Sequence, residues 1–108
     1  MAVYTIARFE VRSDARDQAE RAMHELASYV RKELPDSMWT AYRDPRAPTH
    51  YTAFIRADDP GADERHRNAP GTRAFVATLS PLVVGEVEFT QLELVTSSDL
   101  APRRRTGR

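Results

Sequence analysis

Two strand-like runs separated by a proline-bearing turn constrain the fold of this chain more than any other feature, and they lie within residues 33–56. Each run carries large aromatic side chains, namely Trp39, Tyr42, Tyr51 and Phe54. Because proline fixes φ and lacks a backbone N–H, Pro45 and Pro48 favour a turn over a continuous strand. The segment therefore predicts a β-hairpin whose turn spans residues 43–48.

The residues before this hairpin predict a strand followed by a long helix. Side chains alternate in character over residues 3–11, which is typical of a strand with one buried face. Ser13 and Asp14 are residue types that cap a helix N-terminus, and Pro35 disfavours helical geometry at the residue before it. We therefore expect a helix that ends at residues 33–34. Its apolar stripe consists of Ala19, Met23, Leu26, Val30 and Leu34.

The residues after the hairpin predict two short helices and a final strand. A turn at residues 59–63 leads into a short helix around His66, and residues 68–72 interrupt it. A second helix follows and ends at Pro81, and residues 86–95 form the last strand. The side chains that the second helix is expected to direct inward are Ala74, Phe75 and Leu79.

This order of elements predicts a single α+β domain over residues 1–96. The order β-α-β-β-α-β is that of a ferredoxin-like fold, with a four-stranded antiparallel sheet and helices on one face. The other face of the sheet would still present apolar side chains to water, so we expect a second copy of the chain to cover it. The sequence therefore predicts a homodimer.

Composition makes several classes of function unfavourable. The 108 residues carry 16 basic and 16 acidic side chains and no cysteine, so we expect no nucleic-acid partner and no thiolate metal site. No apolar run reaches the length of a membrane span, and the N-terminal residues do not resemble a signal peptide, so we expect a soluble cytoplasmic protein without a membrane partner. Residues 97–108 form a basic tail, which is either a flexible end or a segment that packs on a partner subunit.

Several short segments resemble one known family in their order and spacing. They are Ala7–Val11, Tyr42–Pro45, His66, Ala69–Pro70, Arg73–Phe75, Leu79–Leu82 and Gly85–Phe89. From about Val3 to Val95, the chain resembles the antibiotic biosynthesis monooxygenase (ABM) domain, a family of dimeric α+β barrels. The resemblance implies a monooxygenase without metal or flavin, in which dioxygen reacts with the anion of an anthrone-, phenol- or quinol-like substrate, such as a polyketide. Such chemistry requires a base, hydrogen-bond donors and a dry aromatic pocket.

His66 is the candidate catalytic residue, because it matches the family's recurring histidine in the helical segment after the third strand. Histidine also titrates near neutral pH without perturbation. The other interpretation is a histidine on a solvated helix surface, because residues 63–67 are otherwise charged. His24 and His50 lie at no metal-ligand spacing from His66 or from each other, so no metal site is expected.

Seven further side chains are candidates for substrate binding, namely Trp39, Tyr51, Arg8, Asn68, Arg73, Phe75 and Met23. The aromatic ones could stack on a flat substrate, and they fit equally well in the core or at a dimer interface. Arg8 could bind a substrate oxygen or pair with a glutamate of the other subunit. Asn68 and Arg73 could donate hydrogen bonds at the mouth of a pocket or lie on the surface.

Two departures from the family pattern bear on the reaction. Residues 55–57 read Ile-Arg-Ala where many members have Glu-Arg-Trp, and the missing tryptophan argues against haem as a substrate. Gly71 and Thr72 replace a His-Phe pair, which removes a second histidine and widens the space near Pro70. Two other functions therefore stay open: a polyketide cyclase or isomerase on the same barrel, and a non-catalytic dimeric module that binds a small aromatic ligand.

Overall fold

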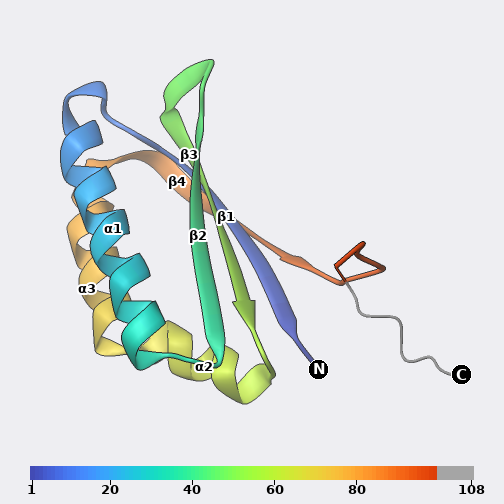
Figure 1. The fold of residues 1–108 in the computed structure, drawn as a ribbon. Coiled ribbons are helices and arrows are strands. Elements are labelled where there is room, and N and C mark those ends of the chain that lie inside the picture. The colour runs from blue at the N-terminus through green and yellow to red at the C-terminus, as the bar shows by residue number, and fades with distance from the viewer. Residues whose placement is uncertain (100–108) are drawn as a thin grey trace, which may run out of the picture.

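The computed structural model describes residues 1–99, which form a four-stranded antiparallel sheet with helices on one face (Figure 1). The elements are β1 (Val3–Val11), η1 (Ser13–Ala15), α1 (Arg16–Glu33), β2 (Ser37–Asp44), β3 (Ala47–Ala57), α2 (Pro60–Asn68), α3 (Pro70–Leu79), η2 (Ser80–Leu82) and β4 (Val83–Leu92), where η marks a short 3₁₀ helix. The strand order is β2-β3-β1-β4, and the α+β ferredoxin-like prediction is confirmed. The arginine-rich end of the predicted tail, residues 100–108, lies outside the described residues.

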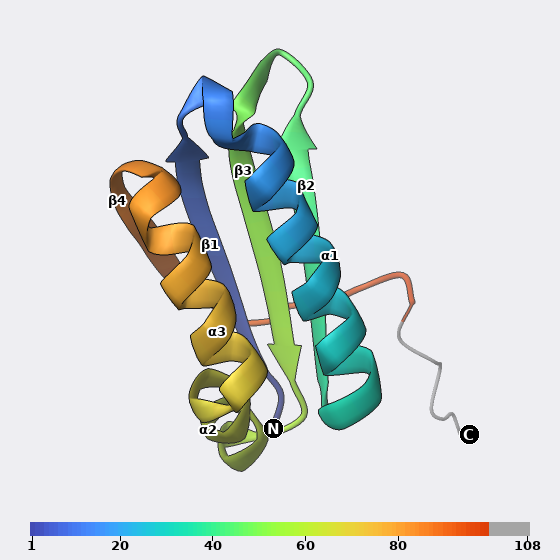
Figure 2. The same ribbon diagram turned by 90° about the vertical axis from the view of Figure 1, so that its left-hand side faces the viewer.

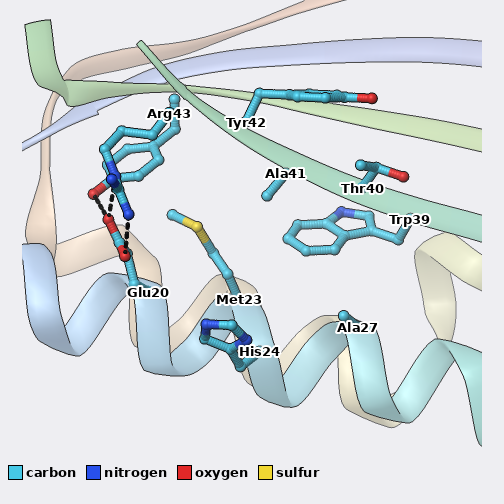
Figure 3. A pocket seen from close by; sticks show the side chains of 10 residues that line it. Glu20, Met23, His24, Ala27, Trp39, Thr40, Ala41, Tyr42 and Arg43 are labelled. Atoms are coloured by element: carbon cyan, nitrogen blue, oxygen red, sulfur yellow. Dashed lines mark hydrogen bonds and ion pairs between the residues drawn. The ribbon is translucent and has the colours of Figure 1, made fainter. Parts of the chain in front are cut away.

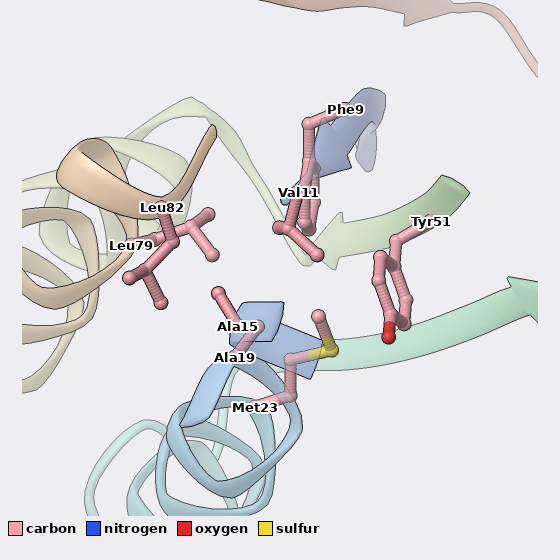
Figure 4. Packing of buried hydrophobic residues seen from close by; sticks show 8 residues of the cluster. All are labelled: Phe9, Val11, Ala15, Ala19, Met23, Tyr51, Leu79 and Leu82. Carbon is pink, nitrogen blue, oxygen red and sulfur yellow. The ribbon is translucent and has the colours of Figure 1, made fainter. Parts of the chain in front are cut away.

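One face of the sheet packs on the helices and forms the core. In the pairing of β1 with β3, Ala7 lies opposite Ala53 and Phe9 lies opposite Tyr51, and the rings of the latter pair stack with centroids 5.7 Å apart. Figure 2 shows α1 and α3 lying side by side across this face. The buried cluster between the layers consists of Phe9, Val11, Ala15, Ala19, Met23, Tyr51, Leu79 and Leu82 (Figure 4).

The first helix begins differently from the prediction. Ser13 and Asp14 lie in the 3₁₀ turn η1, and α1 starts only at Arg16, with Ala15 in the N-cap position. The Asp14 carboxylate accepts a hydrogen bond from Arg12 Nε at 3.2 Å instead of capping the helix. Arg12 therefore binds the Asp14 carboxylate, which the sequence pattern had assigned to the backbone N–H groups of the helix N-terminus.

The hairpin turn is shorter than predicted. Only Pro45 and Arg46 lie between β2 and β3, and the Asp44 carboxylate accepts a hydrogen bond from the Arg46 N–H at 2.9 Å. Pro48 is part of β3, in a stretch where the pairing register shifts next to Asp44. A proline is tolerated at such an irregularity because the ladder there does not require its missing N–H.

The last strand and the helix before it also differ in detail from the prediction. β4 begins at Val83, which pairs with Val11, and ends at Leu92, so the predicted strand was placed three residues too late. Gly85 adopts a φ of +75° where the pairing of β4 with β1 is irregular. Ala74 is exposed rather than inward-facing, because the inner face of α3 is set by Phe75 and Leu79.

Apolar side chains also lie on the opposite face of the sheet. Because side chains alternate along a strand, this outer face carries residues such as Tyr4, Ile6, Met38, Tyr42, Phe54 and Leu92. The rings of Tyr4 and Phe54 approach to 6.0 Å, and Tyr42 is 57% exposed. Figure 1 shows that, over residues 1–99, no helix covers this face.

Candidate functional site

Two cavities open on the helix side of the sheet. The larger one, of about 840 Å³, lies between the sheet and helices α2 and α3. The smaller one, of about 350 Å³, lies between α1 and the edge strand β2. Trp39 lines both cavities.

The larger cavity is mainly apolar. Its sheet side is lined by Thr5, Ala7, Phe9, Trp39, Ala53, Ile55, Val83, Gly85, Val87, Phe89 and Gln91. Trp39 and Phe75 meet edge to face with ring centroids 5.5 Å apart, which gives one side of the cavity an aromatic corner. Phe89 is 71% exposed on the edge strand, so this side of the cavity is open. Such a lining suits a flat, apolar ring system.

Polar side chains are concentrated on the helical side of the larger cavity. Asp63, His66 and Arg67 come from α2, and Thr72 comes from α3. We call these four residues the polar wall. The first three lie on one helix face because they are spaced by three and four residues. Asp59 fixes the start of this helix, since its carboxylate accepts the Ala62 N–H at 2.8 Å.

His66 is the most deeply buried member of the polar wall. The residue is only 4% exposed, and its Nδ1 is buried without a hydrogen-bond partner among residues 1–99. Burial lowers the pKa of the imidazole below its ordinary value, and the nearby Asp63 carboxylate partly opposes this shift. The ring is therefore neutral at neutral pH and can accept a proton. The surface interpretation of His66 is thereby corrected, because the charged neighbours Glu64 and Arg65 point to solvent while His66 points inward.

The other polar-wall residues differ in how their polar atoms are satisfied. Asp63 forms an ion pair with Arg67, with 3.1 Å between Oδ2 and Nε. In contrast, the Thr72 Oγ1 atom is buried and has no hydrogen-bond partner in the described part of the chain. Buried polar atoms in folded proteins are nearly always paired, and within residues 1–99 the atoms on His66 and Thr72 are exceptions, as is Arg16 Nε at the start of α1.

The smaller cavity has a hydrogen-bonded polar network at one end (Figure 3). Arg43 donates from Nε and Nη2 to the two carboxylate oxygens of Glu20, at 2.9 and 3.0 Å. The Tyr51 hydroxyl donates to the same carboxylate at 2.7 Å. The hydrogen bonds from Arg43 and Tyr51 lower the pKa of Glu20, whereas burial and the bond to Glu20 raise the pKa of Tyr51. This network joins α1 to β2 and β3 through three hydrogen bonds to one carboxylate.

The structure brings together only some of the candidate residues. His66, Trp39 and Phe75 line the larger cavity, while Met23 and Tyr51 line the smaller one with Trp39.

Within residues 1–99, Arg8, Asn68 and Arg73 line neither cavity. Arg8 lies on the outer face of the sheet, opposite Thr52 and Glu88. The amide of Asn68 donates to the Glu64 carbonyl at 3.0 Å, which holds it on the helix surface. Arg73 reaches only this Asn68, at 3.4 Å.

Sequence reasoning did not find several residues of the two cavities. Asp63 and Arg67 carry a detectable signal, since they share a helix face with His66. Thr72 appeared only as a departure from a pattern. Glu20 and Arg43 are 23 residues apart, and no local spacing connects them.

The described residues contain neither a cluster of three His, Cys, Asp or Glu side chains able to hold a metal ion nor a helix long and apolar enough to cross a bilayer.

Comparisons with known proteins identify solved structures that have a similar fold. Neither the protein-family models nor the curated protein sequences include a match to this chain. Rv0793 from Mycobacterium tuberculosis is 22% identical, with a TM-score of 0.82 over 92% of this chain and 100% of that one. A Bacteroides thetaiotaomicron protein that carries the antibiotic biosynthesis monooxygenase name is 13% identical, with a TM-score of 0.83 over 94% and 96%.

A third solved structure is that of SnoaB, described as a cofactor-independent oxygenase from Streptomyces nogalater. It is 20% identical, with a TM-score of 0.77 over 92% of this chain and 98% of that one. At these identities the similarity establishes the fold. The chain therefore has the fold of the antibiotic biosynthesis monooxygenases.

Proposed function

We propose that this protein is a cofactor-independent monooxygenase of the ABM family that oxidises an anthrone-, phenol- or quinol-like aromatic substrate with dioxygen, and that His66 is its catalytic base. One observation carries the proposal. A neutral histidine is buried on the wall of an otherwise apolar cavity, and its Nδ1 has no hydrogen-bond partner in the described residues. A cavity of about 840 Å³ also falls in the range of sites that enclose a small organic ligand.

A neutral imidazole on the cavity wall suits proton abstraction from a weakly acidic phenol or enol. The imidazole accepts the proton and the substrate becomes an electron-rich anion beside the imidazolium. The lining is mainly apolar, so the charge on the anion and the charge on His66 interact more strongly than they would in water. Deprotonation is therefore favoured inside the cavity even though burial lowers the pKa of His66 in the empty site.

Dioxygen then oxidises the substrate anion, and the atoms and electrons of the reaction balance. The ring anion transfers electrons to dioxygen, a C–O bond forms, and the imidazolium returns its proton to give a hydroperoxide. Loss of water then breaks the O–O bond and removes the second hydrogen of the same carbon. A CH₂ group thus becomes a carbonyl, one oxygen atom enters the product, and the other leaves as water. Trp39 and Phe75 hold the flat substrate during these steps.

We also propose that the working unit is a homodimer built on the outer face of the sheet. The support is the apolar content of that face, where Tyr4 and Phe54 pack against each other and Met38 is 45% exposed. Sedimentation at micromolar concentration is expected to give twice the chain mass. Changing Phe54 to Glu would place a charge at the centre of the interface and should yield a monomer, whereas an unchanged dimer would refute this arrangement.

The experiment that tests the function is oxygen consumption with a panel of anthrones, phenols and hydroquinones. We expect uptake by the wild-type protein and a loss of about 100-fold or more in kcat/KM for His66→Gln. His24→Gln is the matched control, because His24 is an exposed histidine on α1 outside the larger cavity. Isomerised or cyclised product without oxygen uptake would instead identify a cyclase or isomerase. Ligand binding without any product would identify a binding module.

A further inference from the structure

Arg67 supplies a positive charge to the larger cavity. Among the lining residues within 1–99 it is the only arginine or lysine, and Asp63 is the only aspartate or glutamate. The Arg67 side chain is 64% exposed, whereas that of Asp63 is 19% exposed. A lining residue with so much exposed surface lies where the cavity opens to water. Arg67 therefore places its charge at a mouth of the cavity.

The ion pair with Asp63 holds the guanidinium beside the cavity and leaves most of its donors available. Asp63 lines the same cavity, and its Oδ2 atom is 3.1 Å from Arg67 Nε. Within residues 1–99 this is the one hydrogen bond of the Arg67 side chain, so both Nη groups keep their N–H donors for another acceptor. Because a guanidinium can bind a carboxylate through two parallel hydrogen bonds, Arg67 suits a second carboxylate.

The sheet adds polar side chains at the same end of the molecule. Thr5 and Gln91 lie opposite each other in the pairing of β1 with β4, and both line the larger cavity. Figure 2 shows α2, which carries Arg67, at the end of the sheet where β1 begins. The cavity thus combines a mainly apolar lining with a polar, cationic region at this end.

We propose that Arg67 determines ligand specificity by binding a carboxylate at this mouth while the flat ring of the ligand lies against the apolar lining. The ligand class is therefore an aromatic carboxylate rather than a neutral aromatic compound. This inference rests on the proposed function only in calling the ligand a substrate, because the binding preference itself requires no reaction.

The preference follows from the charge at the mouth. A ligand carboxylate gains charge-assisted hydrogen bonds from the Nη groups of Arg67, which are stronger than the bonds that a neutral group could form. The Asp63 charge repels the same ligand from a greater distance and reduces the gain. For a partly exposed pair of this kind, we expect a preference of about five- to tenfold for the charged ligand over a neutral one.

Helix α2 also carries a matched control for Arg67. Arg65 is 61% exposed and forms an ion pair of 3.1 Å with Asp36, but within residues 1–99 it lines neither cavity. Arg65→Gln and Arg67→Gln therefore remove the same charge from the same helix, and only the second removes it from the cavity. Arg67→Lys keeps the charge without the planar set of donors. Arg67→Met replaces Arg67→Gln if the latter does not fold.

The probes are 2-naphthoate and 2-naphthamide, which share one ring system and differ in the charge of a single substituent. Titration calorimetry at neutral pH and low ionic strength gives the two dissociation constants for each protein. Neither probe carries a hydroxyl group from which a base could take a proton. The result therefore does not depend on turnover.

We expect the wild type and Arg65→Gln to bind 2-naphthoate about five- to tenfold more tightly than 2-naphthamide. The ratio should fall toward one in Arg67→Gln, through weaker binding of the naphthoate alone, and Arg67→Lys should retain part of it. Added salt should weaken the binding of the naphthoate and leave that of the amide unchanged.

Four outcomes would overturn the inference: equal affinities in the wild type, an undiminished ratio in Arg67→Gln, an equal loss in Arg65→Gln, or no binding of either probe. Oxygen uptake with neutral phenols but no preference for the naphthoate would refute this inference alone. A preference for the naphthoate without oxygen uptake on any substrate would refute the proposed function alone.

Discussion

The two cavities on the helix side of the sheet differ in how their polar groups are paired. In the smaller cavity, the Glu20 carboxylate receives three hydrogen bonds from Arg43 and Tyr51. In the larger cavity, His66 Nδ1 and Thr72 Oγ1 are buried with no partner in residues 1–99. The first arrangement ties together parts of the fold. The second leaves the hydrogen-bonding capacity of two polar atoms unused within the described residues.

The difference in hydrogen-bond pairing indicates which of the two cavities is the candidate functional site. A fully hydrogen-bonded network contributes to stability, and removing one member leaves its partners without a hydrogen bond. An orphaned buried group costs stability and persists where another role requires it. Substitutions in the two cavities should therefore have opposite profiles, with stability affected in one and activity in the other.

The largest expected effect comes from His66→Leu. Oxygen consumption should fall by about 100-fold or more, because the base is lost. The melting temperature should stay the same or rise, because an unsatisfied polar group is replaced by an apolar one of similar size. Thermal denaturation and an oxygen electrode measure the two properties on the same samples. A large drop in melting temperature would show that His66 is mainly structural. The expected difference between a stabilising cavity and a functional cavity would then not exist.

The next effect concerns the packing that holds the polar wall. Gly71→Ala should lower the free energy of unfolding by about 1–3 kcal/mol, because the new methyl group overlaps the Tyr29 ring. Chemical denaturation measures this change. In the double variant with Tyr29→Ala, the penalty of the Gly71 substitution should largely vanish. An equal penalty in both backgrounds would mean that Tyr29 is not the obstacle.

A third prediction addresses the smaller cavity. Glu20→Ala should lower the free energy of unfolding by about 1–2 kcal/mol, because the nearly buried Tyr51 hydroxyl loses its acceptor. Oxygen consumption should be retained once the variant is folded. The matched control is Glu25→Ala, an exposed glutamate on the same helix, which should change stability by less than about 0.5 kcal/mol. Equal effects of the two substitutions would indicate that the network contributes nothing.

The smallest effect is in the pH dependence of stability. The pKa of His66 is lowered on folding, so the unfolded chain binds its proton first, and stability falls as pH drops below about 6.5. The pKa of Glu20 is also lowered, so its stabilising contribution is present above about pH 4.5 and is lost as pH falls further.

Each group changes stability by less than about 1.4 kcal/mol per pH unit. Denaturation at a series of pH values should show that His66→Leu removes the upper phase and Glu20→Gln removes the lower one. A single phase that both substitutions alter equally would contradict separate roles for the two cavities.

The predictable part of the molecule is the part encoded by local patterns. Alternation along residues 3–11 identified β1, and the apolar stripe with Pro35 identified α1 to within a few residues. The paired aromatic runs identified the hairpin strands. These features depend on neighbours in sequence, and the fold follows from their order.

The remainder depends on contacts between distant segments. Whether Pro48 lies in a turn or at a strand irregularity is decided by pairing across the sheet. The exposure of Ala74 depends on how α3 lies against α1. For the site, the family pattern pointed to His66, but its burial, and the orphaned hydroxyl of Thr72, arise from the junction of two helices. No periodic pattern in the sequence predicts such a junction between two helices.

The most direct test of the central claim is whether His66 takes a proton from a bound substrate. A phenol whose ionised form absorbs at longer wavelength is mixed anaerobically with the protein at a pH about one unit below its own pKa. We predict that the phenolate band grows on binding to the wild type and to His24→Gln, but not to His66→Gln. An equal phenolate band with His66→Gln, or a bound phenol that stays neutral in the wild type, would contradict the account.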